Sequence, residues 1–191
     1  YTKEEIGFPQ NKKNIIYSGR ITRGRGLEIL IEYFNSNIAD FGLVVMGPGD
    51  EYKKYLVELV DSYNLSGNIK FLNPVAPEDV VSVCRLADAG IAPIENICKS
   101  YYYSLPNKLF EYIVAGIPVL CSDFPEMRNL VLSNNIGKVF NIDDVSSLYG
   151  VLDNIFINNE INIFKQNVSK MSNECNWESE KLILDKIYNE I

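Results

Sequence analysis

The sequence predicts an α/β fold: a Rossmann-like, doubly wound parallel sheet of about six strands with helices on both faces. Short apolar runs rich in β-branched residues alternate with segments of helical periodicity. Two of these runs are followed at once by a glycine-rich turn and a helix, and parallel sheets bind ligands at the carboxyl ends of such strands. The 191 residues, 47% of them hydrophobic, suffice for one domain with a full core.

Six segments are expected to form the strands. Five are compact apolar runs typical of buried strands, and the sixth, KVF, is weaker. In chain order they are 14–18 (NIIYS), 42–46 (GLVVM), 68–72 (NIKFL), 89–92 (AGIA), 118–121 (PVLC) and 138–140 (KVF).

Helices are expected between these strands. Leu27, Leu30, Ile31 and Phe34 recur at the i, i+3, i+4, i+7 spacing of one helix face. The later helices are expected over 52–63, over 78–86 behind Pro77, around Lys108 and Glu111 up to Gly116, over 126–132 and over 145–156.

The C-terminal part is expected to be helical as well. The segment 154–173 is polar but still periodic, which indicates a helix and connections. A last helix over 178–191 is expected to start at an anchoring Trp177. Its apolar stripe consists of Ile183, Leu184, Ile187, Tyr188 and Ile191.

Composition excludes several classes of protein. The chain has no histidine, which excludes histidine-based acid–base chemistry and most transition-metal sites within it. Four scattered cysteines without a CxxC pair fit reduced thiols in the cytosol better than disulfides or a zinc site. A net charge of −7 argues against nucleic acid as a partner, and no apolar run reaches the roughly 18 residues of a membrane-spanning helix. The polar start without an initiator methionine indicates a piece of a longer protein.

The loop after the first strand has the composition of an anion site. It runs from Gly19 to Gly26 (GRITRGRG) and holds three arginines and three glycines directly before a helix. Glycines let the backbone approach an anion, and guanidinium groups bind phosphate oxygens through two parallel hydrogen bonds. The alternative is a solvated basic turn.

Two further strand ends carry polar chemistry. Gly47 begins a G-P-G turn that resembles half of a dinucleotide-binding motif, although a plain turn is the alternative. Pro106 presets a helix start, which leaves amides near Asn107 and Lys108 for an anion. Glu111, one turn further on, is placed to accept hydrogen bonds from sugar hydroxyls, the alternative being an exposed Lys–Glu pair. A ligand with a diphosphate and a ribose fits all three strand ends.

These motifs, in this order, resemble the C-terminal nucleotide-binding domain of GT-B glycosyltransferases, in particular the retaining glycosyl transferases group 1 family (family 4). IIYSGRITRGRGLEILIEYF and LVVMGPGDEY are similar to that family's phosphate-binding turn and G-P-G turn. NIKFLNPVAPEDVVSVCRLADAGIAP is similar to its base-binding segment, LPNKLFEYIVAGIPVLCSDFPEMRNLV to its E-A-x-A-x-G-x-P-V-V block, and CNWESEKLILDKIY to its closing tryptophan helix. Arg25 stands where the family usually has a lysine.

The resemblance implies a role for each matched residue. Arg20 and Arg25 would be the catalytic cations that neutralise the donor diphosphate as the sugar–phosphate bond breaks. Val75 would contact the base through its backbone, and Glu111 would hold the ribose hydroxyls. The nucleotide-binding set implied is Gly19, Gly47, Val75, Asn107, Lys108, Leu109 and Glu111. No metal ligand is implied, because the arginines supply the charge and no DxD sequence is present.

One position departs from the family pattern. The family usually has a second glutamate eight residues before the one that matches Glu111, where it contacts the transferred sugar. Tyr103 occupies that position here. Glu95, in a longer loop nearby, is the candidate to replace it.

The expected function is transfer of a hexose-type sugar from a nucleoside-diphosphate donor, UDP-sugar first, in polysaccharide or glycoconjugate biosynthesis. Retention and independence of metal or other cofactors are expected, with a saccharide or lipid-linked acceptor. Residues 1–191 would form the donor domain, and an N-terminal acceptor domain would be missing, so the fragment alone would bind nucleotide without transferring sugar. A GT-B-fold UDP-sugar epimerase and a non-catalytic nucleotide-binding subunit stay open as alternatives. The expected location is the cytoplasm, with peripheral attachment at the inner face of the membrane left open.

Overall fold

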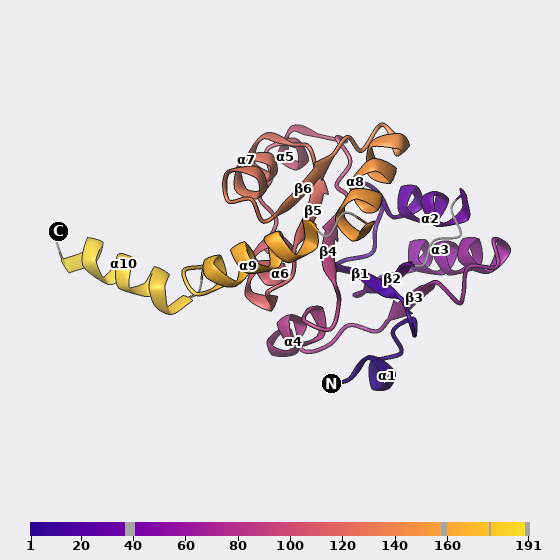
Figure 1. Cartoon of the computed structure of the whole chain (residues 1–191), viewed down its shortest axis with the longest axis horizontal. Helices are drawn as coiled ribbons and strands as arrows, with labels where there is room; N and C mark the ends of the chain where they lie inside the picture. The colour runs from indigo at the N-terminus through magenta and orange to yellow at the C-terminus, as the bar shows by residue number, and fades with distance from the viewer. Residues whose placement is uncertain (37–40, 158–159, 176, 190–191) are drawn as a thin grey trace.

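The computed structural model describes residues 1–36, 41–157, 160–175 and 177–189. Its centre is a parallel sheet of six strands in the order β3-β2-β1-β4-β5-β6 (Figure 1), which confirms the predicted doubly wound class. The strands are β1 (Lys13–Ser18), β2 (Phe41–Met46), β3 (Ile69–Leu72), β4 (Ala89–Ala92), β5 (Val119–Ser122) and β6 (Gly137–Phe140). Each differs from its sequence-based expectation by no more than one residue at either end.

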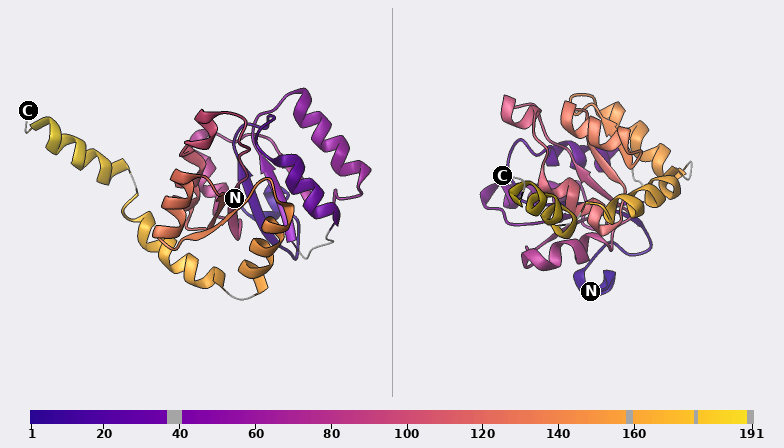
Figure 2. Two further views of the ribbon diagram at one scale, coloured as in Figure 1. Left: turned by 90° about the horizontal axis from the view of Figure 1, so that it is seen from above. Right: turned by 90° about the vertical axis from the view of Figure 1, so that its left-hand side faces the viewer.

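Helices cover both faces of the sheet. The long ones are α2 (Leu27–Ser36), α3 (Glu51–Ser62), α6 (Asn107–Ala115), α7 (Pro125–Ser133), α8 (Val145–Ile157), α9 (Glu160–Ser172) and α10 (Trp177–Asn189). The short ones are α1 (Lys3–Ile6), the 3₁₀ turn η1 (Pro77–Asp79), α4 (Val80–Cys84) and α5 (Lys99–Tyr102). Figure 2 shows α2, α3 and α8 on one face, with α4, α6 and α7 on the other. The expected helix over 78–86 is therefore split into η1 and the shorter α4.

The central strands are buried almost throughout because helices cover them on both sides. Every residue of β2 is buried, as is all of β1 except its first residue. The parallel register pairs Ser18 with Met46, so β1 and β2 end at the same level. The loops that begin at Gly19 and Gly47 consequently emerge side by side.

Helix α6 is fixed against the strands at the point where the strand order reverses. Its buried face includes Leu109, Tyr112 and Ile113, and Gly116 ends it in a left-handed conformation with φ +76°. The Tyr112 hydroxyl donates to the carbonyl of Ile91 in β4 (3.1 Å) and accepts the amide of Ser18 in β1 (2.9 Å). These bonds place the start of α6 at the carboxyl ends of β1 and β4.

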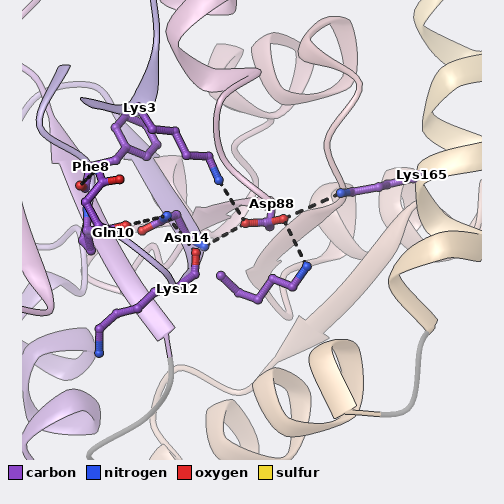
Figure 3. A network of polar contacts seen from close by, with 9 residues as sticks. Lys3, Phe8, Gln10, Lys12, Asn14, Asp88 and Lys165 are labelled. Carbon is purple, nitrogen blue, oxygen red and sulfur yellow. Dashed lines mark hydrogen bonds and ion pairs between the residues drawn. The ribbon is translucent and has the colours of Figure 1, made fainter. Parts of the chain in front are cut away.

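At the amino-terminal ends of the strands, several segments contact Asp88, which directly precedes β4. Its carboxylate accepts a hydrogen bond from the backbone amide of Asn14 (2.9 Å). It also faces the ammonium groups of Lys3 (3.7 Å), Lys13 (3.8 Å) and Lys165 (3.8 Å). Figure 3 shows Lys3 of α1 and Lys165 of α9 pointing toward the carboxylate, with Asn14 of β1 beside it. Asp88 thus links three separate segments at the amino-terminal ends of the strands.

The last helix differs from its expectation. Trp177 is 65% exposed and so is not a buried anchor, and α10 extends away from the sheet (Figures 1 and 2). The expected stripe is present, but Ile183, Leu184, Ile187 and Tyr188 are all exposed, and Ile191 lies outside the described residues. The pattern identified an apolar face but not what covers it.

None of the helices within the described ranges has the length and apolar character needed to cross a membrane.

Candidate functional site

Two neighbouring cavities lie at the carboxyl ends of the strands. The larger, which we call the basic cavity, has a volume of about 430 Å³ and is lined by Tyr17, Ser18, Gly19, Arg20, Arg25, Pro106, Asn107, Lys108 and Glu111. The smaller, the apolar cavity, measures about 120 Å³ and is lined by Ser18, Gly19, Met46, Gly47, Pro48, Pro74, Val75, Val80 and Glu111. The two share Ser18, Gly19 and Glu111. They lie beside β1, where a doubly wound sheet of this strand order binds its ligands.

The glycines at the two strand ends bring the loops into direct contact. Gly47 has φ +152°, and a Cβ atom built on it would lie 1.9 Å from the carbonyl oxygen of Gly19. The Gly19 amide in turn donates to the carbonyl of Met46 (2.9 Å). A Cβ on Gly19 would lie 3.2 Å from the nitrogen of Lys108, so the space above Gly19 holds the ammonium group. A side chain at Gly47 would therefore separate the two loops, whereas one at Gly19 would press on the Lys108 ammonium group.

Lys108 brings an unpaired cation to the basic cavity. The residue is only 8% exposed, and its Nζ has no hydrogen-bond partner among the described residues. The ammonium group lies 3.5 Å from the centroid of the Tyr17 ring, a cation–π contact. Burial, followed by the charge of Arg25, holds the pKa of Lys108 well below its ordinary value, whereas Glu111 raises it. An anion in the cavity would reverse this by favouring the charged ammonium.

Two of the three loop arginines line the same cavity. The Arg25 guanidinium stacks on the Tyr101 ring, with 4.6 Å between Cζ and the ring centroid. Arg20 also lines the cavity, and its carbonyl accepts the Tyr17 hydroxyl (2.7 Å). Arg23 is directed elsewhere: it lies over Tyr52 (5.2 Å) and 3.9 Å from a Glu28 oxygen. Arg20, Arg25 and Lys108 therefore converge on one volume.

Glu111 stands at the boundary between the two cavities. Its Oε2 accepts the Ser18 hydroxyl (3.0 Å), and Ser18 is held in place by the Tyr112 hydroxyl. The carboxylate is therefore oriented by β1 and retains acceptor capacity toward both cavities. Ser18 and Tyr17 were missed by sequence reasoning. Their only signal is their place as the last two residues of an apolar strand before an arginine-rich turn.

The other sequence-predicted residues fall into two groups. Val75 lines the apolar cavity, and Asn107 lines the basic cavity. Leu109 lines neither, because its side chain is in the core and its amide donates to the Pro106 carbonyl (3.0 Å). Tyr103 is 61% exposed and lies outside both linings, and Glu95 accepts the amide of Gly26 (2.9 Å). In the described ranges no group of three or more His, Cys, Asp or Glu side chains is arranged to hold a metal ion.

Comparison with known proteins gives a consistent result. A family model described as "Glycosyl transferases group 1" matches residues 2–171. The D-inositol 3-phosphate glycosyltransferase of Corynebacterium jeikeium is 24% identical over 200 residues, which cover 100% of this chain and 46% of that protein. The chitobiosyldiphosphodolichol beta-mannosyltransferase of Debaryomyces hansenii is 30% identical over 167 residues, covering 79% and 34%.

Solved structures share the fold. Sucrose-phosphate synthase from Thermosynechococcus elongatus superimposes with a TM-score of 0.82 at 20% identity, covering 98% of this chain and 47% of that one. The Anabaena protein HepE in complex with UDP and glucose gives a TM-score of 0.78 at 15% identity, covering 98% and 51%. The chain thus spans about half the length of these structures and less than half of the curated relatives above.

Proposed function

The chain belongs to the glycosyl transferases group 1 family, and from this premise we propose that it binds the nucleoside-diphosphate sugar donor of a glycosyltransferase. UDP-sugar is the proposed donor, and a hexose-type sugar is transferred with retention and without a metal ion. The proposed acceptor is a saccharide or a lipid-linked saccharide in polysaccharide or glycoconjugate biosynthesis.

The observation that carries this proposal is the order of groups along the two cavities. Three cationic side chains surround the basic cavity, a carboxylate stands at the boundary, and Val75 lines the apolar cavity. A nucleoside diphosphate has the same order: diphosphate, ribose, base. The diphosphate is proposed to lie among Arg20, Arg25 and Lys108, with the ribose hydroxyls on Glu111 and the base against Val75. HepE, which shares the fold, has been solved with UDP and glucose.

The cations then have a defined chemical task. When the bond between the sugar and the distal phosphate breaks, its electron pair stays on the phosphate oxygen, which gains negative charge. Guanidinium groups fixed around that oxygen stabilise the developing charge more than they stabilise the intact donor. The amides at the start of α6, at Asn107 and Lys108, add the positive end of the helix. Fixed cations of this kind provide the neutralisation that a metal ion provides in other transferases.

Residues 1–191 are proposed to be the donor-binding half of a two-domain enzyme. The solved structures that superimpose on nearly all of this chain are about twice as long. The exposed apolar stripe of α10 is proposed to pack against the other domain, which would supply the acceptor site. This chain alone is accordingly expected to bind nucleotide without transferring sugar.

Calorimetric titration with UDP, GDP, ADP and CDP tests the proposal. UDP is expected to bind, and Arg25→Ala is expected to weaken binding at least about tenfold, because a charge-assisted bidentate contact is lost. Arg23→Ala is the matched control: it removes a cation from the same loop that faces Tyr52 and Glu28, and should change binding less than about twofold. Absence of binding by all four nucleotides, or equal effects of the two substitutions, would overturn the proposal.

A further inference from the structure

Arg25 is supported by an aromatic ring instead of a carboxylate. Its guanidinium lies over Tyr101, and the structure shows no ion pair to Arg25 within the described ranges. Lys108 is supported in the same way by Tyr17. A carboxylate would hold these cations by occupying their N–H donors and neutralising their charge. A ring face holds the cation and leaves the donors at its edge free for a ligand.

The backbone around Arg25 is held from the same direction. The residues on either side of it are both bonded to Glu95: the carbonyl of Gly24 accepts the Glu95 amide (3.1 Å), and the amide of Gly26 donates to the Glu95 carboxylate (2.9 Å). Ile97 packs on the same turn, since a Cβ atom on Gly24 would lie 2.6 Å from its Cδ1. The segment after β4 therefore contacts the loop after β1 on both sides of Arg25.

Neither Glu95 nor Tyr101 lines the basic cavity, so any effect on the ligand passes through Arg25. Arg25 and Lys108 are like charges at the same cavity, and the Arg25 charge contributes to the lowered pKa of Lys108. The contacts of Tyr101 with Arg25 and of Glu95 with the neighbouring glycines hold Arg25 in place against this repulsion. Without support, the long Arg25 side chain would sample many rotamers and turn toward solvent. Stacking on Tyr101 limits that freedom before the ligand arrives.

We propose that Glu95 and Tyr101 are positioning residues for the diphosphate: Glu95 fixes the backbone on both sides of Arg25, and Tyr101 fixes the plane of its guanidinium toward the basic cavity. The inference rests on the proposed function and deepens it. It also gives Glu95 a role other than replacing the glutamate that is absent at Tyr103, because its carboxylate is committed to the amide of Gly26.

The test compares a ligand that has the diphosphate with one that lacks it. UDP and uridine are titrated into the wild-type chain, Tyr101→Leu and Tyr101→Phe by nuclear magnetic resonance. Tyr101→Leu removes the ring and is expected to weaken UDP binding about three- to tenfold. The affinity for uridine is expected to change by less than about twofold. Tyr101→Phe keeps the ring face and is expected to recover UDP binding.

A double-mutant cycle separates positioning from a general structural role. In the Arg25→Ala background, Tyr101→Leu is expected to have no further effect on UDP binding, because the group it orients is gone. For the backbone contact, Glu95→Gln keeps an acceptor for the Gly26 amide and should bind UDP more tightly than Glu95→Ala. Thermal unfolding of every variant shows whether it is folded.

The outcomes that overturn the inference are distinct from failure of the proposed function. If the wild-type chain does not bind UDP, the proposed function falls, and this inference with it. If the wild type binds UDP but Tyr101→Leu binds it equally well, the inference alone falls. It falls in the same way if Tyr101→Leu weakens UDP and uridine alike, or if its effect persists in full in the Arg25→Ala background.

Discussion

The ammonium group of Lys108 lies 3.5 Å from the centroid of the Tyr17 ring and has no hydrogen-bond partner in the part of the chain that the structure describes. Burial and the nearby Arg25 charge hold its pKa well below the ordinary value of 10.5. The folded state therefore binds this proton less tightly than the unfolded state does. Lys108 is placed to bind an anion. Without a ligand, its unpaired buried amine lowers the stability of the folded chain.

The first prediction is a pH dependence of stability. Between the lowered pKa and about 10.5 the unfolded chain holds more protons, so the free energy of unfolding rises with pH, by at most about 1.4 kcal/mol per unit from this group. Lys108→Met lacks the titrating group. Relative to that variant, the wild type should become more stable in urea unfolding as the pH rises toward 10.5. A stability difference that stays constant over this range would contradict the prediction.

The second prediction concerns Glu111 and the ribose. If Glu111 accepts hydrogen bonds from the 2′ and 3′ hydroxyls, the wild type should bind UDP about tenfold more tightly than 2′-deoxy-UDP, because bonds to a charged acceptor are worth about 1.5–3 kcal/mol. Glu111→Gln should lower that ratio to about three or less in calorimetric titration. Glu126→Gln, an exposed position in α7, is the matched control and should keep the wild-type ratio. A ratio near one in the wild type would remove Glu111 from the ribose site.

The third prediction concerns the contact between the two loops. Gly47→Ala places a Cβ atom 1.9 Å from the Gly19 carbonyl oxygen at a positive φ, so the free energy of unfolding should fall by about 2 kcal/mol or more. Gly150→Ala is the control, because nothing lies within 4 Å of its Cβ position in α8. There the substitution should raise stability by up to about 1 kcal/mol through helix propensity. Similar effects of the two substitutions would mean that the loops separate at little cost.

The sequence could predict the sheet and the edge that carries the site, because both depend on local pattern. β1 and β2 each contain a run of buried apolar residues, and parallel strands place their following loops at one edge. That rule places the loop with Arg20 and Arg25 at the same edge as the helix with Glu111, and all three residues line the basic cavity. The short α5 was not predicted, since four residues are too few to show a helical period.

The contacts of individual side chains within the site depend on tertiary structure, and the sequence pattern did not predict them. The rings of Tyr17 and Tyr101 lie under cations that are distant in sequence, and the strand and turn patterns that contain them are also those of ordinary core or surface tyrosines. Leu109 lies next to Lys108 in the same motif, yet the helix turns it into the core. The helix α1 did have a local signal, because Thr2 and Glu5 form a capping box.

The last prediction concerns Asp88 at the opposite edge of the sheet. Asp88→Ala leaves the Asn14 amide without its acceptor and three ammonium groups without a shared anion, so unfolding should become easier by about 2 kcal/mol. Asp88→Asn keeps an acceptor oxygen and loses only the charge. Its cost should be about 1 kcal/mol at low salt. The cost should shrink in 0.5 M NaCl, where the Debye length is roughly 4 Å, because charge pairs at the surface are screened. Urea unfolding at the two salt concentrations separates the contribution of the charge from that of the hydrogen bond to Asn14. A salt-independent loss in Asp88→Ala with no loss in Asp88→Asn would show that the ammonium groups contribute nothing and that Asp88 acts only as the acceptor for Asn14.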